Sequence, residues 1–466
     1  MSNEARIEEK MRAAGMGDAA VSAFLHNFRS LSGSSPLMAE SSIEPVRDLP
    51  DLESLTAPGH GEIDPGLLQS TVVIKLNGGL GTGMGLQKAK SLLEVRDGLS
   101  FLDLIAKQVL SLREKHGDGL RFLLMNSFST NADTREHLSK YPDLGDPADL
   151  EFVQNMAPKI DADSLAPAEA NGNDGLEWCP PGHGDLYPAI LASGKLDELL
   201  AAGVKYAFVS NSDNLGATLD GTLLKYFAES DQPFMMEVTR RTPADRKGGH
   251  LAVDKATGGL CLRESAQCAD DDEAFFQDIN RHKFFNTNNL WLRLDLLKEE
   301  LDKNGGYLPL AVIRNKKTLD PRDGGSTPVL QLETAMGAAI SCFEGAGAIN
   351  VPRRRFAPVK TTDDLLSLRS DAYVLTEDFR LQLHPDRQGK PPTVKLDKKH
   401  YKLVDGLERA LEKAVPSLMA CEKLEVTGPA VFGENVRIEG EVSIENASSD
   451  WKEVPGSTYV NETITL

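Results

Sequence analysis

Glycine fills five of the eight positions from 78 to 85, directly after an apolar run at 71–76, and lysines follow at 88 and 90. A strand that ends in such a loop can present successive backbone N–H groups to a phosphate, because glycine has no Cβ to hold the ligand away. A helix that starts after the loop adds positive potential. Lys90, in an acidic chain, favours phosphate binding over the alternative of a purely structural tight turn.

Two common phosphate-binding motifs can be compared with this loop. The Walker motif GxxxxGK[ST] would end at Ala89-Lys90-Ser91, but Met84 and Ala89 stand where its glycines are required. The dinucleotide motif GxGxxG also fails, because Met84 or Leu86 occupies its last position. The sequence therefore argues against a P-loop NTPase, and a Rossmann dehydrogenase is a weak alternative.

Two further polar stretches lie near the predicted ends of strands and starts of helices. The sequence PPGHGD at 180–185 predicts a rigid turn whose glycines let a ligand approach His183. The sequence VSNSDN at 209–214 places polar residues at the carboxyl end of a predicted strand, where open α/β sheets bind ligands. Taken alone, the first stretch also fits a helix cap by Asp185, and the second fits an Asx turn.

Basic residues occur near position 360. Lys360 precedes TTDD, which by itself predicts a helix cap at Thr362 or Asp363. The arginine run at 353–355 is typical of a solvated face, although it could also raise the positive potential near an anion site.

Composition limits the partners of the chain. Its 466 residues include 51 Lys or Arg and 70 Asp or Glu, so the net charge is −19, which argues against nucleic acid or an anionic membrane as partner. No apolar run is long enough for a membrane span, and the N-terminus lacks a basic region followed by an apolar core, so no secretory signal is predicted. The five widely spaced cysteines fit reduced thiols and predict a cytoplasmic location.

Strand-like and helical segments alternate from residue 71 onward, at the spacing of βαβ units. This alternation predicts an α/β fold with a mainly parallel sheet and helices on both faces. Buried strands are predicted at 71–76, 120–126 and 204–211, and helices at 100–117 and 185–203.

The two ends of the chain differ from this middle part. Residues 3–32 predict one or two amphipathic helices, and the acidic stretch 33–69 predicts a wrapping segment with little regular structure. Near the C-terminus, valines recur every five or six residues with glycines between them, which predicts a short β-solenoid. These valines are Val426, Val431, Val436 and Val442.

The motifs together resemble the eukaryotic-type UTP–glucose-1-phosphate uridylyltransferases, or UDP-glucose pyrophosphorylases. The resemblance covers roughly residues 20 to 450 and is carried, in the family's order, by LNGGLGTGMG, LLMNSFST, WCPPGHGDLY, YAFVSNSDNLGATLD, FFNTNNLWL, VLQLETAMGAAISCF and INVPRRRFAPVKTTDDLL. It implies a nucleotide-diphospho-sugar transferase fold, which is Rossmann-like, with a central mixed sheet flanked by helices and a small C-terminal left-handed β-helix. The implied divisions are an N-terminal helical and wrapping segment (1–69), a catalytic domain (70–380) and the β-helix domain (381–466).

The reaction implied by the resemblance is transfer of a uridylyl group from UTP to glucose 1-phosphate, giving UDP-glucose and pyrophosphate. The attacking sugar phosphate is already an anion, so the site needs positive charge and positioning groups rather than a general base. The resemblance implies Mg²⁺ as cofactor, because a hard cation held by one carboxylate and by substrate phosphates serves this chemistry.

The resemblance also assigns roles to matching positions. Lys90 and Lys360 would hold phosphates and neutralise charge in the transition state, and Asp213 would bind Mg²⁺. His183, Asn288 and Glu333 would bind the sugar phosphate or the sugar. The residues expected to contact the nucleotide, with the amide of Gln154 reading the uracil, are Leu76, Asn77, Gly78, Gly79, Gln154, Gly182 and Asn211.

Several alternatives stay open at the level of sequence. The family's Gly-Pro pair before the loop lysine is replaced by Lys88-Ala89, so Lys88 is an alternative to Lys90. An enzyme of the same class could use galactose 1-phosphate or N-acetylglucosamine 1-phosphate, although LNGG and NTNN favour glucose. A non-catalytic nucleotide or sugar sensor is the alternative from another class, and the presence of Lys90, Asp213 and Lys360 argues against it. Assembly into a homo-oligomer also stays open.

Overall fold

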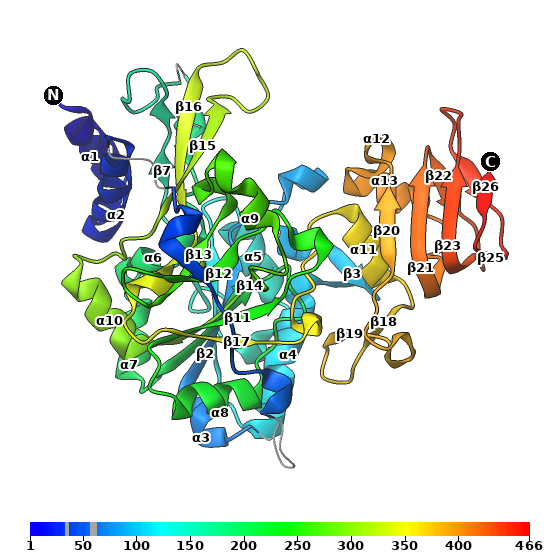
Figure 1. Cartoon of the computed structure of the whole chain (residues 1–466), viewed down its shortest axis with the longest axis horizontal. Helices are drawn as coiled ribbons and strands as arrows, with labels where there is room; N and C mark the ends of the chain where they lie inside the picture. The colour runs from blue at the N-terminus through cyan, green and yellow to red at the C-terminus, as the bar shows by residue number, and fades with distance from the viewer. Residues whose placement is uncertain (33–36, 56–62, 171) are drawn as a thin grey trace.

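The computed structural model describes residues 1–32, 37–55, 63–170 and 172–466. In these residues the chain builds a ten-stranded sheet surrounded by helices (Figure 1). The main path of the sheet runs β1-β12-β14-β10-β2-β5-β6, with β11, β13 and β17 paired at its side. These strands are β1 (Ile43–Pro45), β2 (Thr71–Asn77), β5 (Arg121–Asn126), β6 (Glu151–Val153), β10 (Tyr206–Asn211), β11 (Phe234–Arg240), β12 (His250–Asp254), β13 (Leu260–Arg263), β14 (Phe284–Arg293) and β17 (Gly347–Asn350).

The described α-helices are short, and none of them is long and apolar enough to cross a membrane. They are α1 (Asn3–Ala13), α2 (Asp18–Arg29), α3 (Pro65–Gln69), α4 (Phe101–His116), α5 (Asn131–Leu138), α6 (Leu186–Ala192), α7 (Lys195–Ala201), α8 (Gly221–Glu229), α9 (Glu273–Gln277), α10 (Leu294–Lys303), α11 (Thr362–Arg369), α12 (Lys398–Tyr401) and α13 (Val404–Ala410).

Strands β2, β5, β6 and β10 form the parallel centre of the sheet. β2 pairs in parallel with β10 on one side and with β5 on the other, and β5 pairs with β6. Val73 of β2 packs in the hydrophobic cluster that includes α4 and α8, whereas Val72 and Ile74 pack in the cluster that includes α6, α7 and α10. Helices thus cover both faces of the sheet, and every residue of β2 is buried, as the apolar run predicts.

The sheet is mixed because β14 runs antiparallel to both β10 and β11. The pairing of β11 with β14 shifts register between Glu237 and Val238, and Asn288 on the facing strand has a φ of 57°. Such a bulge redirects the side chains of one strand. The NTNN segment of β14 therefore interrupts the regular pairing of β14 with β11.

The helix predicted over 100–117 is confirmed, with Ser100 as N-cap in a capping box with Asp103 and with Gly117 at its end. The single helix predicted over 185–203 is wrong. The chain forms α6 and α7 instead, because Gly194 between them has a φ of 77°, a left-handed conformation that ends a helix.

The N-terminal helices α1 and α2 confirm the helical prediction for residues 3–32. They pack through Ile7, Met11 and Phe24 against the hairpin of β15 (Val312–Thr318) and β16 (Pro328–Thr334), which also pairs with β8 (Ile160–Asp161) (Figure 1). Of the predicted wrapping segment 33–69, residues 33–36 and 56–62 lie outside the described residues. Its described part adds β1 to the sheet edge and forms α3.

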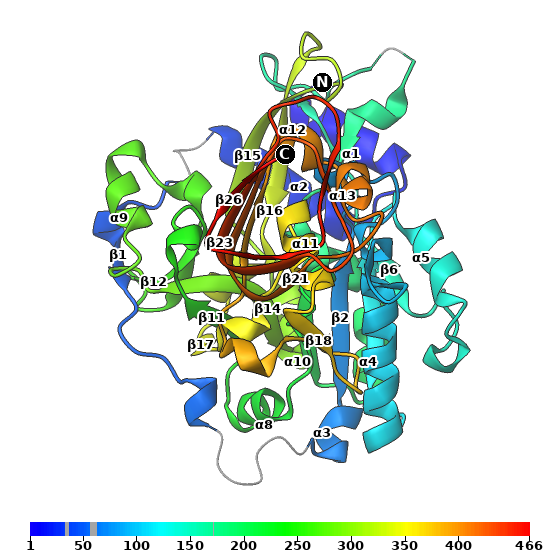
Figure 2. The ribbon, with the colours of Figure 1, turned by 90° about the vertical axis from the view of Figure 1, so that its right-hand side faces the viewer.

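The C-terminal strands, where the valine repeat predicts a β-solenoid, pair in parallel. β21 pairs with β20 and with β23, and β25 and β26 continue along β23. β22 pairs with β24 in a second parallel sheet. Figure 2 looks onto these strands, which stack in front of the central sheet. The strands are β20 (Thr393–Leu396), β21 (Ser417–Thr427), β22 (Ala430–Phe432), β23 (Arg437–Glu445), β24 (Lys452–Val454), β25 (Thr458–Val460) and β26 (Thr463–Thr465).

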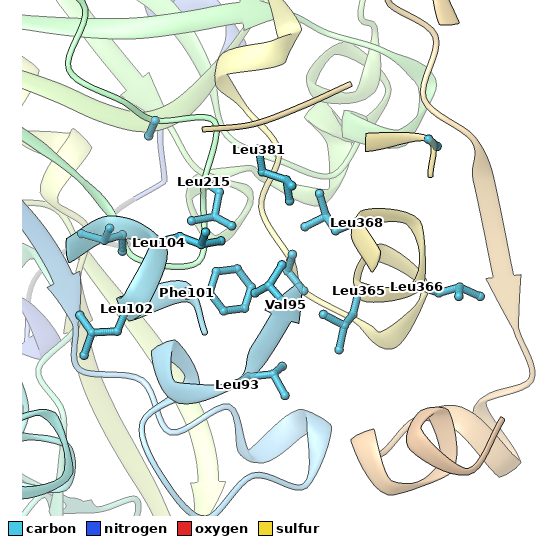
Figure 3. Close-up of a cluster of buried hydrophobic side chains, with 14 of the residues drawn as sticks. Leu93, Val95, Phe101, Leu102, Leu104, Leu215, Leu365, Leu366, Leu368 and Leu381 are labelled. Carbon is cyan, nitrogen blue, oxygen red and sulfur yellow. The ribbon is translucent and has the colours of Figure 1, made fainter. Parts of the chain in front are cut away.

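A hydrophobic cluster joins the helices of the central sheet to the C-terminal part. Phe101 of α4, Val95 of β3 (Glu94–Arg96), Leu365 of α11 and Leu381 of β19 (Leu381–Leu383) meet in it (Figure 3). β19 pairs with β18 (Tyr373–Leu375), so the domain boundary predicted between 380 and 381 falls within this hairpin, directly before β19. The division into three domains stays a prediction.

The break between α6 and α7 depends on Gly194. Gly194→Ala should lower the free energy of unfolding by about 1 kcal/mol, because a residue with a Cβ disfavours the left-handed conformation. The built Cβ would meet no other atom within 4 Å, so this cost is conformational and not a clash. The measurement is the midpoint of urea unfolding. Gly324→Ala, at an open position without positive φ, is the control and should stay near wild type; equal midpoints for both variants would contradict the assignment.

Candidate active site

The glycine-rich loop leaves β2 at the carboxyl edge of the parallel strands. Gly81 and Gly85 are in the left-handed conformation (φ 66° and 82°), and a short 3-10 turn, Thr82–Met84, lies between them. The N–H of Lys90 donates to the carbonyl of Gly79 across the loop (3.0 Å). The loop therefore folds back on itself and returns Lys90 to the end of the strand.

Lys90 faces the loop that follows β10. Its Nζ donates to Oδ2 of Asp213 (2.7 Å) and to the carbonyl of Val359. The N–H of Val359 donates to the carbonyl of Asp213 (3.1 Å). Because Val359 directly precedes Lys360, these contacts bring the segments of Lys90, Asp213 and Lys360 together. Lys88, the alternative to Lys90, is exposed.

Asp213 keeps one carboxylate oxygen available for a cation. Its Oδ1 is buried without a hydrogen-bond partner, whereas Oδ2 is paired with Lys90. Across the described residues, no group of three or more His, Cys, Asp and Glu side chains is placed to hold a metal. A single carboxylate suits Mg²⁺ that is bound mainly by the phosphates of a nucleotide. The residues present therefore fit such an ion better than a metal centre enclosed by protein ligands.

Lys360 is exposed just before α11. Its backbone N–H and that of Thr361 donate to Oδ2 of Asp364 (both 2.8 Å). Thr361 is the N-cap of α11 and forms a capping box with Asp364. The cap predicted at Thr362 or Asp363 is therefore wrong by one or two residues, because the reciprocal partners are Thr361 and Asp364.

Gln154 lies against the start of the glycine-rich loop. Its backbone N–H donates to the carbonyl of Asn126 at the end of β5 (2.8 Å). A Cβ built at Gly78 would lie 3.1 Å from the side-chain amide of Gln154. The absence of a side chain at Gly78 therefore lets the amide of Gln154 approach the backbone of the loop. Gly78 and Gln154, both predicted to contact the nucleotide, are thus neighbours in space.

The turn at 180–185 packs against the end of β16. Gly182 has a φ of 84°, and a Cβ there would lie 2.5 Å from the carbonyl oxygen of Thr334. The N–H of Thr334 donates to the carbonyl of Pro181 (3.0 Å). This close approach requires glycine, and it brings the predicted residue Glu333 next to Gly182.

His183 is held in one tautomer. Its Nδ1 accepts a hydrogen bond from the N–H of Met336 (3.0 Å), so the neutral ring carries its proton on Nε2. Burial lowers the pKa of His183 to about 4, and the imidazole is therefore neutral at neutral pH. The side chain offers an uncharged N–H donor.

Asp185 does not cap the helix that follows it. The N-cap of α6 has no side-chain hydrogen bond. The carboxylate accepts instead from the backbone N–H of Asn155 (2.6 Å) and from its Nδ2 (3.0 Å to Oδ1). The helix-cap interpretation of this turn is therefore wrong, because the carboxylate finds its donors on a segment 30 residues earlier in the chain.

Three predicted residues lie at the paired ends of β2 and β10. Asn211 ends β10 opposite Leu76 of β2. The side chain of Asn77 is buried and donates to Oδ1 of Asn126 (2.7 Å). The side-chain amide of Asn77 is thus engaged within the protein, which leaves its backbone as the part suited to a ligand.

Asn288 lies on the bulge of β14. Its N–H donates to Oδ1 of Asn286 (2.8 Å), and its own Oδ1 accepts from Nδ2 of Asn286 (2.9 Å). The next residue, Asn289, accepts at its side chain from Asn214 (3.3 Å), and Asn214 directly follows Asp213. The bulge therefore adjoins the loop of Asp213.

A buried ionic group behind this edge is not among the sequence-predicted residues. Lys75, within β2, donates to Oγ of Ser210 (2.7 Å) and to the carbonyl of Ala217 (2.6 Å). Burial, and then the charge of Arg355, lowers the pKa of Lys75 to about 7. A lysine inside the apolar run TVVIKL is the sequence signal that could have revealed it.

The arginine run at 353–355 is not a solvated face throughout. Arg355 is buried and donates to both carboxylate oxygens of the buried Glu237 (2.7 and 2.8 Å). Arg353 donates to Asp245 (2.6 Å). The solvated-face interpretation fails because acidic partners from distant segments pair with all three of these arginines.

Glu264 is a further carboxyl near Lys360. Burial raises the pKa of Glu264, and the charge of Lys360 acts in the opposite direction. The carboxyl thus lies within electrostatic reach of the exposed lysine, directly after β13. Its sequence context, RES, contains no motif that would have singled it out.

Comparisons with known proteins point to one enzyme family. The sequence profile of the family described as UTP–glucose-1-phosphate uridylyltransferase matches residues 21–439. The enzyme of that name from Solanum tuberosum is 42% identical over 402 residues, which cover 85% of this chain and 82% of that protein. The corresponding enzyme from Saccharomyces cerevisiae is 41% identical over 400 residues, covering 85% and 78%.

Solved structures agree with the sequence matches. A structure of UDP-glucose pyrophosphorylase from Leishmania major, described in open and closed forms, has a TM-score of 0.93 at 48% identity and covers 100% of both chains. A mutant of that enzyme in complex with UDP-glucose has a TM-score of 0.92 at 48% identity, again over 100% of both chains. With a matching profile over most of its length and relatives above 40% identity, the chain belongs to the UTP–glucose-1-phosphate uridylyltransferase family.

Proposed function

We propose that this protein transfers a uridylyl group from UTP to glucose 1-phosphate, giving UDP-glucose and pyrophosphate. The observation that carries the proposal is the meeting of Lys90, Asp213 and the segment of Lys360 at one edge of the sheet, in a chain of this family. Two lysines and a carboxylate with a free oxygen are what a site needs to bring two polyanions together. The related Leishmania major enzyme in complex with UDP-glucose supports the same ligand here.

The reaction is a single displacement at phosphorus. An oxygen of glucose 1-phosphate attacks the α-phosphorus of UTP, and the bond from that phosphorus to the bridging oxygen of the β-phosphate breaks. Pyrophosphate leaves with the electron pair, and no proton has to be removed from the nucleophile, which is already an anion. The protein therefore contributes position and charge.

Lys90 and Lys360 bind the phosphates and neutralise the charge that develops on them. Lys90 already lies at the carboxyl edge, and the exposed Lys360 approaches from the start of α11. Asp213 would hold Mg²⁺ through its free Oδ1. When bound, Mg²⁺ neutralises phosphate charge and stabilises the departing pyrophosphate.

The remaining site residues select and orient the substrates. The amide of Gln154 donates to and accepts from the imide edge of uracil, whereas cytosine presents its donor and acceptor in the opposite order and would need the amide reversed. His183 donates from Nε2 to the sugar phosphate, and Asn288 and Glu333 bind the sugar phosphate or its hydroxyl groups. The nucleotide is contacted by Leu76, Asn77, Gly78, Gly79, Gly182 and Asn211.

We also propose that the parallel C-terminal strands are turns of a left-handed β-helix and form a domain from residue 381. Their parallel pairing supports a solenoid. We also propose a cytoplasmic location, and a homo-oligomer stays an open possibility. Neither property affects the chemistry described above.

The test of the proposed function is pyrophosphate release from UTP and glucose 1-phosphate, with and without Mg²⁺. CTP and ATP replace UTP in parallel reactions, and galactose 1-phosphate and N-acetylglucosamine 1-phosphate replace the sugar phosphate. Release that requires UTP, glucose 1-phosphate and Mg²⁺ together supports the proposal. Faster pyrophosphate release with another sugar phosphate would show that this sugar phosphate, and not glucose 1-phosphate, is the substrate. No release with any pair of nucleotide and sugar phosphate would favour the sensor hypothesis.

Lys360→Ala should lower kcat about a hundredfold or more, because one preorganised charge contact to the transition state is lost. The fold should survive, since the lysine side chain is exposed. The measurement is steady-state pyrophosphate release with circular dichroism as a check of folding. Lys225→Ala, on the surface of α8, is the control and should retain full activity. A kcat near wild type for Lys360→Ala would refute the assigned role.

Asp213→Ala should raise the Mg²⁺ concentration needed for half-maximal activity at least tenfold, because the carboxylate ligand is lost. The measurement is a Mg²⁺ titration of pyrophosphate release at saturating substrates. Asp197→Ala, in the exposed first turn of α7, serves as control and should titrate like wild type. An unchanged titration for Asp213→Ala would move the metal ligand to another residue.

A further inference from the structure

Asp185 is a buried carboxyl without a cationic partner among the described residues. Its residue is 5% exposed, and its carboxylate accepts the backbone N–H and the side-chain Nδ2 of Asn155 (2.6 and 3.0 Å). Burial raises the pKa of Asp185 to about 7, because a buried site disfavours the charged form. A carboxyl kept in such a place needs an explanation beyond helix capping, which it does not perform.

One end of this contact leads to the candidate uracil site. Asn155 follows Gln154, whose backbone N–H is bound to Asn126 and whose amide lies against Gly78. Beyond Gln154, this segment is tied to the turn at 180–185 by the hydrogen bonds from Asn155 to Asp185 and by the pairing of β7 (Ala157–Pro158) with β9 (Trp178–Cys179).

The other end leads to the candidate sugar-phosphate site. Asp185 and His183 belong to the same turn, which the contact of Gly182 with Thr334 presses onto β16. The ring of His183 is fixed by the N–H of Met336. A carboxylate in this turn that holds Asn155 therefore helps to set the distance between the two sites, together with the pairing of β7 and β9.

Packing alone does not fix this junction. A cavity of about 30 Å³ adjoins Asp185 and is lined by Asn155, Gly184, Thr334 and, from α2, Phe24, among others. Atoms beside a void have partners on one side only, so hydrogen bonds decide their position to a greater extent. Tyr307 is the other titratable residue that lines this cavity.

We propose that Asp185 is a positioning residue that joins the two substrate sites. Its carboxylate holds Asn155, and through it the uracil-reading amide of Gln154, in a fixed place relative to His183. The inference rests on the proposed function, because it takes Gln154 and His183 as ligand-binding groups. It assigns no contact between Asp185 and a substrate.

The test compares Asp185→Ala and Asp185→Asn with wild type in pyrophosphate release from UTP and from CTP. Asp185→Ala should raise the KM for UTP about tenfold and leave kcat within about threefold. The contact of Asp185 with Asn155 positions groups that bind the substrates and does not touch the reacting atoms. The preference for UTP over CTP, as the ratio of kcat/KM values, should fall at least fivefold. Asp185→Asn should restore most of both properties, because its amide oxygen still accepts the N–H of Asn155.

The control is Asp103→Ala, which removes another buried carboxylate that accepts from Ser100 and Tyr141, in the cap of α4. It should lower the melting temperature without changing the KM for UTP or the preference for UTP over CTP. Asn155→Ala is the second variant. It should also raise the KM for UTP and lower the preference for UTP over CTP, so it tests the inference even if Asp185→Ala does not fold.

Wild-type KM and nucleotide preference in Asp185→Ala would overturn the inference and leave the proposed function intact. The same changes in Asp103→Ala would also overturn it, since the effect would then be one of general stability. A wild-type protein that releases no pyrophosphate from UTP would overturn the proposed function, and the inference would fall with it.

Discussion

The parallel pairing of β2 with β10 sets Asn211 opposite Leu76, so the chain leaves both strands at the same edge of the sheet. One strand continues into the glycine-rich loop and the other into the loop of Asp213. Parallel strands direct their carboxyl ends to one side, and the groups that follow them must share that space. The ion pair of Lys90 with Asp213 is a consequence of this pairing, as is the approach of the segment that carries Lys360.

Buried charges beneath this edge hold the loops in place. Lys75 binds the carbonyl of Ala217, and Arg355 binds the carbonyl of Thr218 while paired with Glu237. Buried ion pairs add little net stability, because desolvation offsets their attraction. Their value here is geometric: charged hydrogen bonds direct the backbone of the 212–218 loop. Because the net charge of the chain is −19, polyanionic substrates would have to be held by local positive charge.

Glycine serves the candidate site by allowing close approach. At position 78 it admits the amide of Gln154, and at position 182 it admits the backbone of Thr334. Neither contact needs the glycine itself to touch a ligand. The bare backbone lets segments that do carry ligand-binding side chains lie side by side, so a small number of hydrogen bonds, such as those from Asn155 to Asp185, can set distances across the site.

The sequence by itself determined the local elements and the chemistry available to them. Apolar runs predicted β2 and β10, the helical periodicity that ends at Gly117 predicted α4, and the order of motifs indicated the family, because each signal lies within a short stretch of chain. Only the tertiary structure decided the partners. Asp185 binds Asn155 and does not cap α6, Arg355 is buried against Glu237, and Thr361 caps α11. The break at Gly194 belongs to the same group, since glycine permits a left-handed turn but only packing selects it. Side-chain partners depend on which distant segments the fold brings within about 3 Å of each other, and no local pattern encodes that distance.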